Sequence, residues 1–175
     1  MADENDNLCF NTCEEYEDEF EDRIYVELRI YPGVISSFDV TRLLGIQPTD
    51  YVEIGEERRS ITTGLTRIGE INGWFLSSRS FVQSRDMNRH IDWLTEKLNN
   101  CDQALKQLQK TDGVKMYVTC KWWVEVDGGG PILLPKQMRD LADLNLECSF
   151  DFQYYGIEDR IPGVILQDAA DFHLN

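Results

Sequence analysis

The chain has 175 residues, a length typical of one domain, with 42% hydrophobic residues and a formal net charge of −15. No apolar run approaches the roughly 20 residues that a membrane span needs, and the first ten residues lack the basic start and apolar centre of a signal peptide. These features argue against a membrane partner and against nucleic-acid binding, which needs concentrated Lys and Arg, and they favour the cytoplasm.

The negative charge is concentrated at the two ends of the sequence. Residues 1–22 contain ten acidic residues and no Lys or Arg, and residues 156–175 contain four acidic residues and one Arg. We predict an acidic N-terminal segment (1–22), a single α+β domain (23–156) and an acidic C-terminal extension (157–175). An acidic segment can steer a basic partner toward the protein, and its alternative role is to keep the chain soluble.

The first part of the domain predicts a strand, a short helix and a second strand. Residues 24–31 alternate apolar and polar side chains with period two, which is typical of a strand with one buried face. A helix capped by Ser36 or Ser37 follows and ends before Gly45. Residues 51–54 predict the next strand.

The stretch that follows is the most basic part of the chain. Residues 55–72 are rich in Gly, Thr and Arg, which predicts a hairpin or a long loop. Arg58, Arg59 and Arg67 supply its positive charge. Residues 73–77 predict another short strand.

The strongest helical signal lies between Asp86 and Lys110. Apolar residues recur there every three or four positions and form one stripe: Met87, Ile91, Leu94, Leu98, Cys101, Leu105 and Leu108. We predict one long helix that lies on the sheet through this stripe. A coiled coil is the alternative.

The last part of the domain repeats the order of the first. Residues 114–126 and 146–155 alternate as strands, and a helix over 136–144 begins at Pro135. This order echoes residues 24–54 and indicates a weak internal β-α-β repeat. Strict alternation predicts a largely antiparallel sheet with helices on one face, so the fold class is α+β, a ferredoxin-like or related two-layer sandwich.

The sequence contains no recognisable catalytic motif, and we expect no catalytic residue, cofactor or metal. Its histidines are His90 and His173. A pair with Asp86 or packing in the first helical turn explains His90 better than catalysis does. Cys9 and Cys13 lack the further ligands that zinc requires, so we interpret them as ordinary thiols.

Several aromatic residues fall on the polar faces of the predicted strands: Tyr25, Tyr31, Tyr117, Trp123 and Tyr155. Tyr, Trp and Arg are enriched at protein interfaces, so these residues indicate a binding surface. The alternative is that another layer covers this face, for example a strand over residues 163–166. Base stacking, as in RNA-binding domains, is disfavoured by the acidic ends.

Six pieces of the sequence carry a family resemblance: VELRIY, DVTRLLGIQPTDYVEIGE, GWFLSS, MNRHIDWLTEKL, the strand through TCKWW, and PKQMRDLADLNLECSFDFQYY. Together they cover roughly residues 23–155 and resemble a bacterial family known as a domain of unknown function, DUF4279. The most specific pieces are the LLGIQPT turn, Trp74 and the helix with His90 and Trp93, whereas residues 58–71 match less well. The family has no established activity, so the resemblance implies no catalytic residues. Some members are thought to be immunity proteins encoded beside toxins.

These observations lead us to expect a non-enzymatic binding protein, most concretely an immunity-like protein that neutralises a toxin or effector by direct contact. The acidic candidates for contact with a basic protein partner are Glu14, Glu15, Glu17, Asp18 and Glu19. The alternative is an enzyme or small-ligand binder with a pocket near Trp74, His90 and the Arg58/Arg59 stretch.

Overall fold

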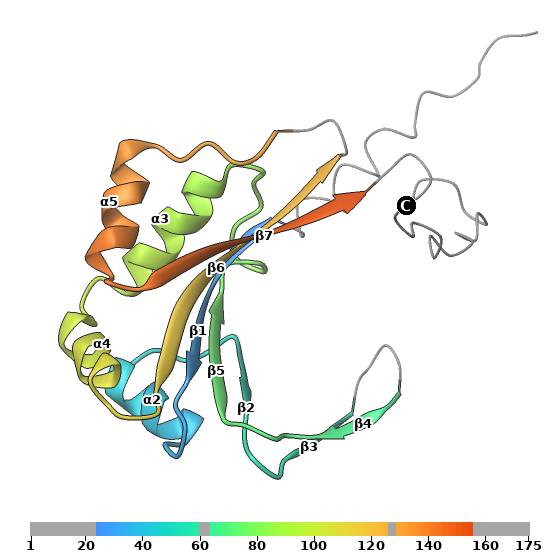
Figure 1. The fold of residues 1–175 in the computed structure, drawn as a ribbon, viewed down its shortest axis with the longest axis vertical. Helices are drawn as coiled ribbons and strands as arrows, with labels where there is room; N and C mark the ends of the chain where they lie inside the picture. Colours follow the sequence, from blue (N-terminus) through green and yellow to red (C-terminus); the bar gives the residue numbers. More distant parts are fainter. Residues whose placement is uncertain (1–23, 60–63, 126–128, 156–175) are drawn as a thin grey trace, which may run out of the picture.

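The computed structural model describes residues 24–59, 64–125 and 129–155. A five-stranded sheet carries helices on one face, and a two-stranded hairpin projects from one end of the sheet (Figure 1). The elements in chain order are β1 Tyr25–Tyr31, α2 Ser37–Leu44, β2 Asp50–Val52, β3 Glu57–Arg59, β4 Thr66–Ile68, β5 Gly73–Ser77, α3 Met87–Lys97, α4 Asp102–Gln109, β6 Lys115–Glu125, α5 Pro135–Asp143 and β7 Glu147–Tyr155.

The order of the strands in the sheet is β2-β5-β1-β6-β7. The first four of these strands pair antiparallel and have the order of a ferredoxin-like fold, in which β5 separates the parallel strands β1 and β2 of a split β-α-β unit. Strand β7 pairs parallel with β6, directly beside it. The predicted α+β sandwich and its largely antiparallel sheet are therefore confirmed. The two β-α-β units differ because a strand is inserted only into the first.

The alternation in the sequence separates the two faces of the sheet. Val26, Leu28 and Ile30 of β1 are fully buried under the helices, whereas the residues between them are only half-buried. Burial of such side chains stabilises the fold by roughly 1.5–3 kcal/mol each. The hydrophobic core therefore lies on the helix side of the sheet.

The predicted long helix over 86–110 is wrong in one respect, because the chain forms two helices there. Helix α3 ends at Lys97 and α4 begins at Asp102, with a tight turn between them in which the Cys101 N–H donates to the Leu98 carbonyl at 2.9 Å. The exposed Asn99 and Asn100 lie in this turn, and asparagine side chains compete for helical backbone hydrogen bonds.

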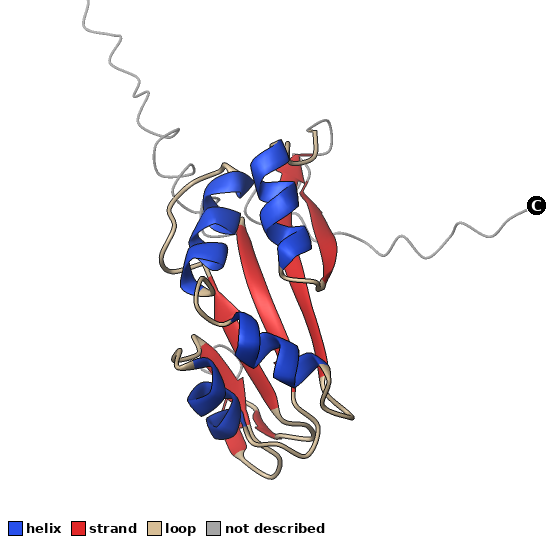
Figure 2. Cartoon of the chain, turned by 90° about the vertical axis from the view of Figure 1, so that its left-hand side faces the viewer, coloured by secondary structure: helices blue, strands red, loops and turns tan. Residues whose placement is uncertain are grey.

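The predicted stripe is nevertheless buried along its whole length: Met87, Ile91, Leu94, Leu98, Cys101, Leu105 and Leu108. The turn lets α4 change direction while its apolar side still faces the sheet. Figures 1 and 2 place α3 beside α5 over one half of the sheet and α4 beside α2 over the other half. None of the helices in the described ranges is long and apolar enough to cross a membrane.

Candidate binding surface

The face of the sheet that carries no helix displays a row of side chains across neighbouring strands. The register places Phe75 of β5, Arg29 of β1 and Tyr117 of β6 side by side, with Asp50 of β2 next to Phe75. Because alternate residues of a strand share a face, Tyr31 lies on this face too, one step along β1 from Arg29. We call this surface the helix-free face.

Three aromatic rings form a contiguous group on the helix-free face. The Tyr31 ring stacks on Tyr117 with centroids 5.9 Å apart and meets the edge of Phe75 at 5.8 Å. All three rings are half-buried. Gly73 makes room for this group, because a Cβ atom there would lie 2.7 Å from Cζ of Phe75. Burial, with Tyr117 alongside, raises the pKa of the Tyr31 hydroxyl above its ordinary value, so this ring stays neutral at physiological pH.

Most of the charges on the helix-free face are paired within it. Arg29 Nε donates to Glu27 Oε1 at 2.7 Å. Lys121 of β6 forms an ion pair with Asp151 on β7, directly opposite in the parallel register. These pairs leave the centre of the face nearly neutral, with aromatic rings as its most prominent feature.

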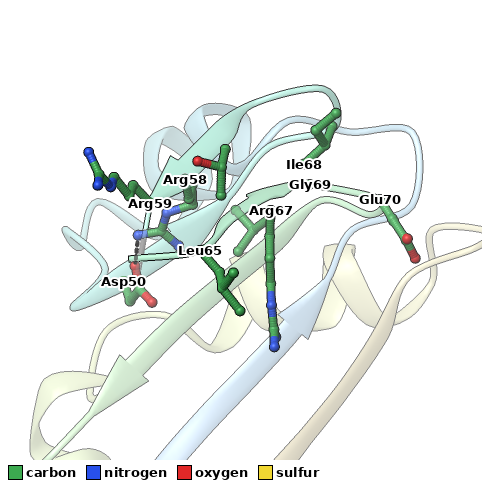
Figure 3. Close-up of a pocket in the computed structure, with 10 residues that line it drawn as sticks. Asp50, Arg58, Arg59, Leu65, Arg67, Ile68, Gly69 and Glu70 are labelled. Atoms are coloured by element: carbon green, nitrogen blue, oxygen red, sulfur yellow. Dashed lines mark hydrogen bonds and ion pairs between the residues drawn. The ribbon is translucent and has the colours of Figure 1, made fainter. Parts of the chain in front are cut away.

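The hairpin β3–β4 is held to the edge of the sheet at its base. Arg58 donates to Asp50 Oδ1 at 2.7 Å (Figure 3). It also donates to the Tyr51 carbonyl at 2.7 Å. The hairpin also passes so close to the chain after β2 that a Cβ atom at Gly69 would lie 2.1 Å from the Glu53 carbonyl oxygen. The position of the hairpin therefore depends on Gly69, which allows the close approach, and on Arg58, which binds the edge of the sheet.

A cavity of about 1190 Å³ lies beside this hairpin. Its lining includes Arg58, Arg59 and Arg67 from the hairpin together with Asp50 and Val52 from β2. Asp50 and Val52 belong to the helix-free face, because Asp50 pairs with Phe75 and lies two residues from Val52. The cavity and the helix-free face therefore lie on the same side of the sheet.

His90 and Trp74 do not line this cavity, because both are fully buried on the helix side. The Trp74 Nε1–H donates to Thr41 Oγ1 of α2 at 3.0 Å. Among the described residues, the cavity near Arg58 and Arg59 therefore takes its further lining from β2 and the hairpin, and Trp74 and His90 lie in the core.

Hydrogen bonds from its surroundings satisfy the buried ring of His90. Its Nε2 lies 2.8 Å from the Ser84 carbonyl, which only accepts, so Nε2 carries the proton. Its Nδ1 then accepts from the Ser78 hydroxyl at 2.8 Å, and that hydroxyl accepts from the Val26 N–H at 2.9 Å. Burial lowers the pKa of His90 below its ordinary value, which keeps the ring neutral. The structure thus packs His90 into the core with both ring nitrogens bonded.

The expected pair between His90 and Asp86 is absent from the hydrogen bonds and ion pairs of the described residues. Asp86 instead caps α3, where its Oδ1 accepts from the Asn88 N–H at 3.0 Å. The Ser78–His90 contact resembles a nucleophile beside a base, but both side chains are fully buried. Within the described residues no cluster of three side chains has the composition and geometry to hold a metal ion.

The register places four of the predicted aromatic residues on the helix-free face: Tyr25, Tyr31, Tyr117 and Trp123. Tyr155 ends β7, but its side chain lies outside the described residues. Other predictions also fall outside the described ranges: the partner candidates Glu14, Glu15, Glu17, Asp18 and Glu19, the cysteines Cys9 and Cys13, His173, and the covering strand over 163–166.

Sequence reasoning missed Phe75, which completes the aromatic group. The strand Gly73–Ser77 is too short to show a clear alternation, so its sequence alone does not assign Phe75 to a face. The signal that was present is the glycine two residues before Phe75, because an aromatic ring often covers a glycine on the same face of a strand.

Residues 22–155 match the model of a family described as a domain of unknown function, DUF4279. Neither the curated proteins nor the solved structures include a significant match to this chain. The matched range begins just before β1 and ends with β7, so it contains the whole sheet, all the helices described here and the hairpin. The chain therefore belongs to the DUF4279 family.

Proposed function

We propose that the chain is a non-catalytic protein-binding domain whose helix-free face engages a protein partner. The observation that carries this proposal is the contiguous group of Tyr31, Phe75 and Tyr117 on a face that no described helix covers. Half-buried aromatic rings of this kind present a large, rigid contact area, and Tyr and Trp are among the residues that dominate binding energy at interfaces.

The hairpin adds a wall to this surface. Arg58 fixes it to Asp50 at the edge of the face, so a partner on the sheet also meets the side chains of the hairpin. A sheet face with one raised edge offers more contact area to a protein than to a small ligand. This shape supports a macromolecular partner.

We propose a toxin or effector as the class of partner, neutralised by direct contact as immunity proteins do. The charge of the sequence supports a basic partner, since residues 1–22 contain ten acidic residues and no Lys or Arg. Charge complementarity of this kind accelerates association more than it strengthens the final complex.

Parallel affinity captures from the native host with the tagged full-length chain and two double variants test this proposal. The variant Tyr31→Ala/Tyr117→Ala removes two rings from the helix-free face. The matched control Phe38→Ala/Phe81→Ala removes two exposed rings on the helix side, where Phe38 is 71% and Phe81 60% exposed. We expect a protein that is captured by the wild type and by the control but lost with Tyr31→Ala/Tyr117→Ala.

The opposite pattern would contradict the proposal. A protein that is retained by Tyr31→Ala/Tyr117→Ala and lost with Phe38→Ala/Phe81→Ala would place the binding surface on the helix side. Thermal unfolding of both variants controls for misfolding, because a variant that unfolds near the wild-type temperature has kept its core.

A further inference from the structure

Strand β7 leaves one long edge of the sheet without a partner among the described residues. It has nine residues, Glu147–Tyr155, and is the last strand in the order β2-β5-β1-β6-β7. Its parallel pairing with β6 runs from Glu147 to Tyr155 without a bulge. The strand at the other margin of the sheet, β2, has only three residues, Asp50–Val52. The outer side of β7 is therefore the longest open edge of the described sheet.

This edge lacks the features that usually keep a free edge from pairing. Edge strands commonly carry Pro, Lys or a bulge, because each of these opposes the addition of another strand. The sequence of β7, ECSFDFQYY, contains no Pro, Lys or Arg. Its free backbone donors and acceptors are therefore suited to recognition by strand addition.

Two phenylalanine rings beside this edge are exposed to solvent. Phe150 pairs with the fully buried Cys120 of β6, so it points to the helix side, and Phe152 shares that side. The two rings stack with their centroids 6.3 Å apart, and they are 38% and 40% exposed. Aromatic rings are enriched at protein interfaces, so these two indicate that the edge contacts another protein.

A second copy of β7 fits this edge when the two strands run antiparallel about a two-fold axis. An axis perpendicular to the sheet keeps the helix sides of both copies together, so each residue faces one on the same side of the sheet. Only the position of the axis along β7 is then left to determine, and the charges of the strand restrict it.

Repulsion disfavours two positions of the axis. With the axis at Asp151, the two Asp151 carboxylates face each other, and each is neutralised by a single cation, Lys121 of its own chain. With the axis at Ser149, each Asp151 faces Glu147 of the second copy. Like charges directly opposite each other destabilise a strand pair, so neither register fits well.

An axis at Phe150 avoids these contacts and gives the polar side chains suitable partners. The two Phe150 rings face each other, and Phe152 lies diagonal to Phe150 of the second copy, within reach of an aromatic ring. Asp151 faces a serine of the second copy. Gln153 donates one N–H to Asp151 at 2.8 Å and has a second N–H for Glu147 of the second copy. An axis at Phe152 would leave Glu147 without this donor.

We propose that two copies of the chain pair through β7, antiparallel about a two-fold axis at Phe150. The two sheets then form one continuous sheet of twice the width. Their helix-free faces point to the same side, so the dimer presents two aromatic groups to a partner and gains from binding through both. The dimer forms without that partner, so it goes beyond the proposed function and fails or stands independently of it.

Sedimentation equilibrium of the full chain measures the association directly. We expect a monomer–dimer equilibrium that salt strengthens, because screening weakens the repulsion between two chains of formal charge −15. Phe150→Lys should weaken the dimer several-fold, because two like charges then lie about 5 Å apart across the axis. The matched control Phe38→Lys changes a ring that is 71% exposed on α2 and should leave the dimer unchanged.

A mixing experiment tests the position of the axis. A residue on the axis faces its own copy, so equal amounts of Phe150→Lys and Phe150→Glu should restore the dimer as a pair of opposite charges. Mixing Phe152→Lys with Phe152→Glu should not restore it, because these two positions lie about 14 Å apart along the paired strands.

Three results would overturn the proposal: a wild type that stays monomeric at high protein concentration, a Phe150→Lys variant that dimerises like the wild type, or a mixture at position 150 that stays monomeric. If the variants at position 150 fail to fold, hydrogen exchange of the wild type provides the test. Protection of the β7 amides should rise with protein concentration. Protection that is equal at every concentration, as pairing with another part of the same chain would give, would also overturn the proposal.

Discussion

The polar and aromatic side chains on the two faces of the sheet differ in how deeply they are buried. On the helix side, His90 is fully buried with both ring nitrogens bonded, and Trp74 is fully buried with its indole N–H bonded to Thr41. On the helix-free face, Tyr31, Phe75 and Tyr117 pack on one another and stay half-buried. The residues that form the core and the aromatic residues proposed to bind a partner therefore lie on different faces. Substitutions on the two faces should therefore affect different measurements.

The largest effect should come from the core on the helix side. Leu98 is 1% exposed and belongs to the stripe that packs α3 and α4 on the sheet. We expect Leu98→Ala to lower the free energy of unfolding by roughly 2–5 kcal/mol, because it leaves a cavity in a packed core. Chemical denaturation followed by circular dichroism measures this loss, with the exposed Phe38→Ala as a control that should change little. A midpoint unchanged by Leu98→Ala would show that the stripe does not carry the core.

An intermediate effect should come from the buried histidine. His90→Ala removes the partner of the Ser78 hydroxyl and of the Ser84 carbonyl, and leaving such buried groups unsatisfied costs roughly 1–3 kcal/mol. Denaturant unfolding at pH 7.5 gives this value. A stability equal to that of the wild type would mean that water replaces the imidazole at no cost.

The same histidine should make stability depend on pH. The pKa of His90 is lowered by burial from its ordinary value of 6.5, so the unfolded chain binds a proton in a pH range where the folded protein does not. The contribution of His90 to the free energy of unfolding is therefore fully present above pH 6.5 and is lost as the pH falls toward the folded-state pKa. We expect the wild type to lose more stability than His90→Ala between pH 7.5 and pH 5.5. Parallel pH profiles for the two proteins would refute this explanation.

The smallest effect on stability should come from the hairpin on the other side. The Arg58–Asp50 pair is about half exposed, and such pairs contribute about 0–1 kcal/mol. We expect Arg58→Gln to leave the global unfolding midpoint nearly unchanged while it increases amide hydrogen exchange in residues 57–59 and 66–68. Hydrogen exchange with mass spectrometry measures this local change. A large loss of global stability would show that the hairpin is part of the core and would erase the contrast between the two faces.

Much of the sheet could be predicted from the sequence because alternation reports directly which side chains face the core. The pattern of residues 24–31 placed Leu28 inside and Arg29 outside, and the structure confirms both. The break between α3 and α4 could not be predicted in the same way. An apolar stripe reports which side of a segment is buried, and Leu98 and Cys101 stay buried through a turn as they would in a helix.

The arrangement of the candidate site depended on contacts between residues far apart in the chain, which no local pattern reveals. The basic stretch around Arg58 was visible, but its position beside the sheet results from the bond to Asp50 and the close approach of Gly69 to Glu53. Likewise, His90 was visible as one of two histidines, yet its partner Ser78 belongs to the loop after β5, twelve residues away. Local sequence therefore predicted the faces and a pocket near Arg58 and Arg59, but it did not reveal that Asp50 and Val52 complete the lining in place of Trp74 and His90.

The most direct test of the contrast between the two faces is hydroxyl-radical footprinting of the full-length chain, alone and in complex with the partner that it captures. Mass spectrometry then reports the oxidation rate of each aromatic side chain. We predict that binding slows oxidation of Tyr31, Phe75 and Tyr117 and leaves Phe38 and Phe81 unchanged. Protection of Phe38 and Phe81, with unchanged oxidation of the three rings on the helix-free face, would contradict the assignment of binding to that face.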